Sequence, residues 1–402
     1  MGVTSRLRTV VGGLRGEGRG WLLLSVAAGW FLVLGMRFVV PSILPTITAD
    51  FDTSASQAGF AVTVLWVTYA VMQFPAGAFA DRLGERTLLA AGLLLAGTGL
   101  VSYAFTPTFG LFVAATGLFG LGTGLYGPPR GTVISKTYDR NDGAAFGTML
   151  AAGSVGAAAL PALAAVAVQS IGWRTALGVT APLFLLVALG VWWALPPRAV
   201  LVADGDGQSL AAALRSAAAA VRNRRIALAV AGATLMLFAF QAVTAFLTTY
   251  LTTVKGLTQG TAGGLLGGLF LVGALSQSVA GGLADRYGAP RVLTGIGVVS
   301  VLPLVALPLA DGRAALALLS AAVGIRMSIG PVSNAYIVDL LPDDVQGTAW
   351  GALRTGFFIV GSFGSTVVGY MADAALFDVA FYGLAAITAV GAVVYVFLPE
   401  RP

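Results

Sequence analysis

Apolar residues run along this chain in long, nearly unbroken stretches that short polar segments separate. An α-helix of about twenty such residues crosses the ~30 Å hydrocarbon core of a bilayer. Only helices or closed barrels can cross it, and stretches of this length exclude barrel strands. The pattern therefore predicts transmembrane helices over 21–45, 57–79, 87–106, 109–131, 143–168, 175–195, 225–251, 259–283, 292–310, 314–339, 347–371 and 379–398.

The composition supports the same interpretation. Hydrophobic residues make up 57% of the chain and charged residues only 10%, whereas soluble domains carry about 25% charged residues. The 54 glycines suit helices that approach one another closely in lipid, where packing holds them together. We predict an all-α, multi-pass integral protein of the cell membrane, with the lipid bilayer as its surroundings.

Cysteine and histidine are both absent, and the formal net charge is +6. Disulfides, thiolate metal sites and histidine chemistry are therefore excluded. We also find no phosphate-binding G-x-x-x-x-G-K-[ST] loop, and no cluster of acidic residues near one interface that a membrane enzyme would need. We expect no enzyme activity, no cofactor and no metal, and we read the positive charge as membrane orientation rather than as a sign of a nucleic-acid partner.

The basic residues predict that orientation. With the N-terminus inside, the cytoplasmic segments hold sixteen arginines and lysines, and the outer segments hold only Arg174, Lys255 and Arg313. Basic residues accumulate on the cytoplasmic side of membrane proteins. Both termini are therefore predicted to be cytoplasmic, and residues 1–20 form a cytoplasmic segment before a retained first helix.

The chain also contains an internal repeat. Residues 77–86 read GAFADRLGER and residues 281–291 read GGLADRYGAPR, so the frame G-x-x-A-D-R-x-G recurs after 204 residues. This divides the chain into six-helix bundles over 21–195 and 225–402, with a cytoplasmic linker over 196–224. Within the linker, an alanine-rich basic stretch would form either a short helix on the inner leaflet or a solvated connection.

Two six-helix halves with this repeated motif resemble the major facilitator superfamily (MFS) over essentially the whole chain. The resemblance implies the MFS fold, with 12 transmembrane helices in two pseudo-symmetric six-helix bundles. It also implies that Asp81 helps to latch the two halves in one conformation. Setting the membrane topology is the alternative role for the motif. The gating motif comprises Gly77, Asp81, Arg82, Gly84, Arg86, Gly281, Asp285, Arg286 and Gly288.

Two departures from the family patterns bear on the driving force. Thr116 stands where many proton-driven members carry an arginine before G-x-G in helix four. In helix five, Leu160 replaces the glycine before Pro161 of the antiporter motif. Both departures weaken a proton-coupled drug antiporter, which stays the nearest rival function.

Charged residues inside the predicted spans point to a functional site, because a charge near the bilayer centre is costly. Arg37 lies in helix one, Arg326 in helix ten and Arg354 in helix eleven, whereas Arg130 ends helix four and is expected at the interface. Helices one, four, seven and ten line the central cavity in the family that this chain resembles. We therefore expect Arg37 and Arg326 to face that cavity, one from each half.

No carboxylate lies at comparable depth, so an anionic substrate would supply the missing negative charge. We expect substrate contacts from Arg37, Arg326, Arg354, Gln241, Tyr336, Asn334, Gln73 and Tyr69. Alternatively, these arginines bond backbone carbonyls or reach toward an interface, or Arg354 pairs with Asp339.

The expected function is movement of a small solute, an anion by preference, by alternating access between two rocking halves. Since the cavity offers no evident proton-carrying carboxylate, we favour facilitated flow, exchange, or co-transport in which the substrate carries the proton. A non-transporting membrane sensor of the same fold is the alternative from another class. We expect a monomer, the usual state of the family.

Overall fold

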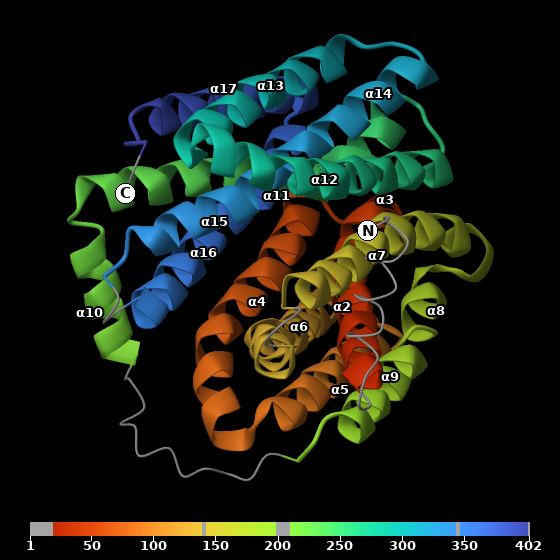
Figure 1. Ribbon diagram of the computed structural model, residues 1–402. Helices are drawn as coiled ribbons and strands as arrows, with labels where there is room; N and C mark the ends of the chain where they lie inside the picture. Colours follow the sequence, from red (N-terminus) through yellow and green to blue (C-terminus); the bar gives the residue numbers. More distant parts are fainter. Residues whose placement is uncertain (1–18, 139–141, 198–209, 343–345, 401–402) are drawn as a thin grey trace, which may run out of the picture.

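The computed structural model describes residues 19–138, 142–197, 210–342 and 346–400, apart from the side chains of Arg19, Ala78, Asp81, Asp142 and Leu210. Helices make up nearly all of this part of the chain, and it contains no strand (Figure 1). Most of the predicted N-terminal segment 1–20 and residues 198–209 of the predicted linker lie outside the described residues.

Twelve helical stretches in the described part are long and apolar enough to cross a membrane, as predicted. The first half contains α2 (Arg19–Ser42), α3 (Leu44–Phe51), α4 (Ala55–Leu83), α5 (Glu85–Tyr103), α6 (Phe109–Thr137), α7 (Asp142–Ile171), α8 (Trp173–Gly178) and α9 (Ala181–Ala194). After α10 (Leu210–Ala220), the second half contains α11 (Arg224–Thr253), α12 (Gln259–Tyr287), α13 (Ala289–Leu309), α14 (Arg313–Val323), the 3₁₀ turn η2 (Gly324–Ser328), α15 (Ile329–Asp339), α16 (Gln346–Asp373) and α17 (Phe377–Val396).

The helices pack as two bundles: in Figure 1 the first lies at the lower right and the second at the top and left of the view. In the first bundle, α2 packs on α7, and α4 and α5 pack on α6; in the second, α13 and α11 pack on α17. The bundles meet along two long helix pairs, α4 with α16 and α7 with α12. This arrangement confirms the predicted pair of six-helix bundles.

Glycines allow the bundles to touch along these pairs. A Cβ atom on Gly59 of α4 would overlap the carbonyl oxygen of Ser365 in α16, and one on Gly369 would overlap that of Ala55. Gly267 of α12 faces the Ala158 carbonyl of α7 in the same way. Small residues serve this purpose in lipid, where close packing replaces the hydrophobic drive.

Local sequence decides where several helices begin. Ser54 caps α4 through its side-chain oxygen and the N–H of Gln57, and the Gln57 side chain returns the bond to the Ser54 N–H. Thr108 and Thr258 cap α6 and α12 through their side-chain oxygens. Each cap satisfies amide groups that a helix start leaves free.

The two copies of the repeated motif adopt the same backbone turn. Gly84 ends α4 with φ 81°, and Gly288 ends α12 with φ 85°. Only glycine adopts this conformation without strain. The last glycine of each copy of the motif is therefore needed for the sharp turn between two consecutive spans.

The alanine-rich basic stretch of the linker, for which the sequence allowed either a helix on the inner leaflet or a solvated connection, contains the helix α10. Ala213, Ala217 and Ala220 lie on one buried face, and α10 packs on α16. Arg215 is exposed on α10, and so are Arg222 and Arg224 beyond its end. The basic, exposed side of this segment matches the predicted interfacial helix, whose position on the inner leaflet stays a prediction.

Candidate functional site

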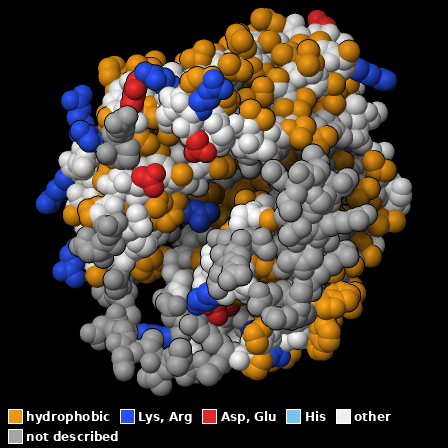
Figure 2. All heavy atoms as spheres, in the orientation of Figure 1, with side chains coloured by type: hydrophobic (Ala, Val, Ile, Leu, Met, Phe, Trp, Pro, Cys, Tyr) orange, Lys and Arg blue, Asp and Glu red, His pale blue; other side chains and the backbone are white. Residues whose placement is uncertain are grey.

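A cavity of about 300 Å³ lies between the two bundles. Helices α2, α4, α6 and α7 contribute to it from the first half, and α11, α12, η2, α15 and α16 from the second. Figure 2 shows a hollow between the halves near the centre of the view, with Lys or Arg atoms beside it. Among the described residues, the lining contains four arginines and no carboxylate: Arg37, Arg130, Arg326 and Arg354.

Arg37 is 1% exposed, so its charge is almost completely sealed from bulk solvent. Its Nε donates to the Val33 carbonyl one turn earlier in α2, at 3.2 Å. Its Nη2 is buried without a hydrogen-bond partner. Arg37 therefore does bond a backbone carbonyl, which was the alternative to substrate binding. This bond occupies Nε and leaves the Nη2 donor without a partner.

An aromatic cluster surrounds the Arg37 guanidinium. Its central carbon lies 4.2 Å from the Tyr69 ring centroid and 5.2 Å from those of Trp30 and Trp66. Tyr69 in turn packs edge-on against Phe358 of the other half, with ring centroids 5.7 Å apart. Aromatic faces stabilise a cation without neutralising it, so the positive charge persists.

Arg326 lies in the 3₁₀ turn η2 and is 3% exposed. Its Nη2 donates to the Met236 carbonyl at 3.2 Å and to the Thr388 hydroxyl at 3.3 Å, whereas its Nη1 is buried without a partner. A 3₁₀ turn within a helix is typical of hinges and strained sites. It divides the tenth span at the residue that carries the charge.

Arg354 lies in α16 with its guanidinium carbon 5.5 Å from the Phe358 ring centroid, and its Nε has no partner. The predicted alternative, an ion pair with Asp339, is wrong, since no such pair forms between these two described residues. Asp339 is instead exposed at the end of α15, outside the cavity lining to which Arg354 belongs.

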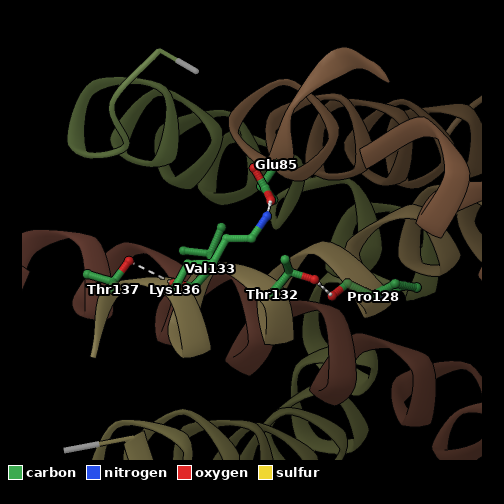
Figure 3. Close-up of polar contacts among 6 residues, drawn as sticks. All are labelled: Glu85, Pro128, Thr132, Val133, Lys136 and Thr137. Carbon is green, nitrogen blue, oxygen red and sulfur yellow. Dashed lines mark hydrogen bonds and ion pairs between the residues drawn. The ribbon is translucent and has the colours of Figure 1, made fainter. Parts of the chain in front are cut away.

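Arg130 corrects the sequence interpretation, which placed it at the interface at the end of helix four. The helix α6 continues through Pro128 and Pro129 to Thr137, and Arg130 lines the cavity. Beyond the prolines, the Thr132 hydroxyl donates to the Pro128 carbonyl at 3.5 Å, and Lys136 pairs with Glu85 of α5 at 2.7 Å (Figure 3). Neighbouring groups thus stabilise a helix that its prolines alone would end.

Three of the five predicted polar ligands lie in the cavity lining: Gln241, Asn334 and Tyr69. Both side-chain polar atoms of Gln241 are buried without a partner. A buried amide without hydrogen bonds is costly. Gln241 therefore lies in the lining with an amide donor and a carbonyl acceptor that no described group satisfies.

The other two predicted ligands, Gln73 and Tyr336, are not in the lining. Gln73 donates to the Gly124 carbonyl at 3.1 Å, and that carbonyl has lost its helical donor because residue 128 is a proline. Tyr336 donates to the Pro399 carbonyl at 2.8 Å. Both side chains thus donate to backbone carbonyls, and the sequence pattern gave no sign of either hydrogen bond.

The two halves are closed at the end that the arginine count places outside. There Gln259 donates to the Ser42 carbonyl at 2.7 Å, and Phe38 packs on Phe270 at 4.3 Å. Asp373 of α16 accepts from the N–H groups of Ala55 and Ser56 in α4, at 2.7 and 2.9 Å. We call this the outer end.

At the opposite end, α6 and α15 make no comparably extensive contact within the described residues. Within the described residues, the arrangement is therefore closed at the outer end and separated between α6 and α15 at the other, with the arginine cavity between the two ends. This geometry suits a protein in which a central site communicates with one side at a time.

The gating-motif residues lie at the separated end. Gly77 has open space beside it, as does Gly281, and Arg82, Asp285 and Arg286 are exposed. The Arg86 guanidinium lies 4.1 Å from the Trp192 ring centroid. The Asp81 side chain lies outside the described part of the structure, so its latching role stays a prediction.

Three cavity residues were not predicted from the sequence to line the cavity: Trp30, Trp66 and Arg130. Trp30 precedes Arg37 by seven residues, which places both on one face of a helix. That spacing was a usable signal for Trp30. For Arg130 the apolar span predicted to end at residue 131 indicated an interfacial position instead.

Two curated relatives are similar to this chain in sequence over part of their length. A probable hexose phosphate transport protein of Chlamydia trachomatis is 26% identical over 135 residues, or 33% of this chain and 30% of that protein. The membrane sensor protein UhpC of Escherichia coli is 24% identical over 178 residues, or 44% of this chain and 40% of that protein. Both matches thus span less than half of these relatives.

Solved structures extend the likeness to the whole chain. A mutant form of the nucleoside transporter NupG superposes with a TM-score of 0.81 and 15% identity, covering 93% of this chain and 99% of NupG. The sequence profile described as Major Facilitator Superfamily matches residues 26–329 and 256–402. The chain therefore belongs to the major facilitator superfamily and is a multi-pass integral membrane protein.

Proposed function

We propose that this protein transports a small organic anion by alternating access, with Arg37, Arg326 and Arg354 binding the substrate. One observation carries the proposal. The described cavity lining holds four arginines and no carboxylate, and buried donors of Arg37 and Arg326 have no partner. A charged group left unpaired in a buried site is costly, so a bound anion is the most economical partner.

The lining also bears on the rival substrate. Its aromatic residues would accept a lipophilic cation, as a drug antiporter requires. The four guanidinium groups would repel that cation, and no carboxylate among the described lining residues offsets them. The anionic substrate is therefore the better match to the same cavity.

Purified full-length protein tests the substrate class. We expect carboxylates and phosphates, glucose 6-phosphate among them, to raise its thermal stability, because a ligand that binds only the folded state stabilises it. Cationic drugs should have no effect. Stabilisation by the cations alone would contradict the proposal and favour the drug antiporter.

Uptake of the best stabilising anion into proteoliposomes tests transport itself. We expect Arg37→Gln and Arg326→Gln each to weaken binding by roughly ten- to a hundredfold, the effect of losing one hydrogen-bonded charge. Arg313→Gln, at an exposed position of the outer end, is the matched control. Anion binding without uptake would instead indicate a sensor.

A further inference from the structure

The indole of Trp30 lies beside two of the cavity arginines. The Arg130 guanidinium carbon is 3.7 Å from its ring centroid, and that of Arg37 is 5.2 Å away. A Cβ atom on Gly153 of α7 would overlap this indole, so the glycine makes room for it. Trp30 therefore occupies a fixed position between helices, with a guanidinium from α2 and another from α6 against it.

Both guanidinium groups keep donors that nothing in the described part of the protein uses. Arg37 Nη2 and Arg130 Nε are buried without a hydrogen-bond partner, and so is the Trp30 Nε1. Arg130 has one contact of its own, from Nη1 to the Met149 sulfur at 3.8 Å, and a thioether is a weak acceptor. A guanidinium that stacks on a ring still presents its N–H edge in its own plane.

The charges also form a group. Arg37, Arg130 and Arg354 all line the cavity, and the guanidinium carbons of Arg37 and Arg130 lie against the same indole, 5.2 and 3.7 Å from its centroid. Like charges this close repel one another in a site of low dielectric constant. A single anionic group on one guanidinium leaves the unused donors of the other without a partner, whereas two anionic groups can pair with one guanidinium each.

We propose that the cavity binds an organic anion with two separate anionic groups, one held by Arg37 and the other by Arg130, on either side of an apolar spacer that contacts Trp30. This assignment rests on the proposed function and narrows its substrate class. Leu34, Phe38 and Leu150 also line the cavity, so an apolar spacer suits it better than a polyhydroxylated one.

Matched pairs of probes separate one anionic group from two. Binding of succinate, glutarate and isophthalate to the purified full chain is compared with binding of their monoamides, which keep the shape and lose one charge. We expect each dicarboxylate to bind about ten- to a hundredfold more tightly than its monoamide. Methylphosphonate, whose charge lies in one group, should bind more weakly than the dicarboxylates.

Variants then locate the second group. Arg130→Gln should remove most of the preference for each dicarboxylate over its monoamide, because the carboxylate that the monoamide lacks loses its guanidinium partner. Arg130→Lys, which keeps the charge, should retain part of the preference. Arg174→Gln is the matched control, because Arg174 also stacks on a tryptophan, Trp173 at 4.3 Å, but outside the cavity.

Several outcomes would overturn the proposal. Equal wild-type affinity for a dicarboxylate and its monoamide would do so without any variant, as would methylphosphonate binding as tightly as the dicarboxylates. An Arg130→Gln protein that keeps the dicarboxylate preference, or that loses both affinities by one factor, would also refute it. In these cases anions still bind, so the proposed function stands; if no anion binds the wild type, both proposals fail together.

Discussion

Asp373 offers the sharpest test of how the outer end closes. Its Oδ1 accepts from the Ala55 N–H at 2.7 Å and its Oδ2 from the Ser56 N–H at 2.9 Å. These are amides of the first turn of α4, which have no partner within their own helix. Asp373 ends α16, in the other half of the chain, so these bonds can form only when the outer end is closed.

The magnitude follows from the two bonds. A hydrogen bond to a charged group contributes about 1.5–3 kcal/mol, with exposed sites near the lower value. A negative charge at a helix N-terminus adds about 0.3–1 kcal/mol. Because Asp373 is exposed and the released amides regain water, we expect Asp373→Asn to cost the outer-closed state about 1.5 kcal/mol, or roughly tenfold in the equilibrium.

The measurement uses the absence of cysteine from the natural chain. Ala104→Cys and Arg313→Cys place spin labels at exposed positions of the outer end, one in each half. Their distance distribution then reports the separation of the halves. We expect Asp373→Asn to raise the population at longer distance, from about 1% to about a tenth if the outer-open state is a typical minor state.

Asp378→Asn provides the matched control for the outer end. Asp378 accepts from the Tyr250 hydroxyl at 2.6 Å, and both residues belong to the second half, so this change breaks no contact between the halves. Identical distance distributions for Asp373→Asn and the wild type would refute the latch. An equal shift in Asp378→Asn would show that the effect is not specific to contacts between the halves.

Two further changes test packing and backbone satisfaction. Gly59→Val places side-chain atoms against the Ser365 carbonyl, so the same label pair should show a larger outer-open population. Gly264→Val is the control, because Gly264 faces open space, and it should leave the distances unchanged. Unchanged distances in Gly59→Val would contradict the prediction and mean that α4 and α16 adjust to the larger side chain. Gln73→Leu removes the donor to the Gly124 carbonyl. It should lower the free energy of unfolding by about 1 kcal/mol, seen as a lower melting temperature, and leave anion affinity unchanged. A tenfold loss of anion affinity would instead indicate that Gln73 binds the substrate, as the sequence analysis predicted.

The sequence by itself determined the parts of this protein that depend on local composition. A run of apolar residues must form a helix in lipid because its backbone has no water to bond with, so twelve runs predict twelve spans. The frame G-x-x-A-D-R-x-G recurs after 204 residues, so the sequence also divides the chain into two halves. The depth of Arg37 and Arg326 likewise follows from counting along a helix.

The tertiary structure decided which polar groups meet. Depth along a helix leaves the facing direction open, because that depends on helix rotation and on which neighbours approach. Gln73 turns away from the cavity because Pro128 leaves a carbonyl unpaired in α6, while Arg130 enters it because α6 continues beyond the same prolines. Both outcomes arise from contacts between residues distant in the chain, which no local pattern encodes.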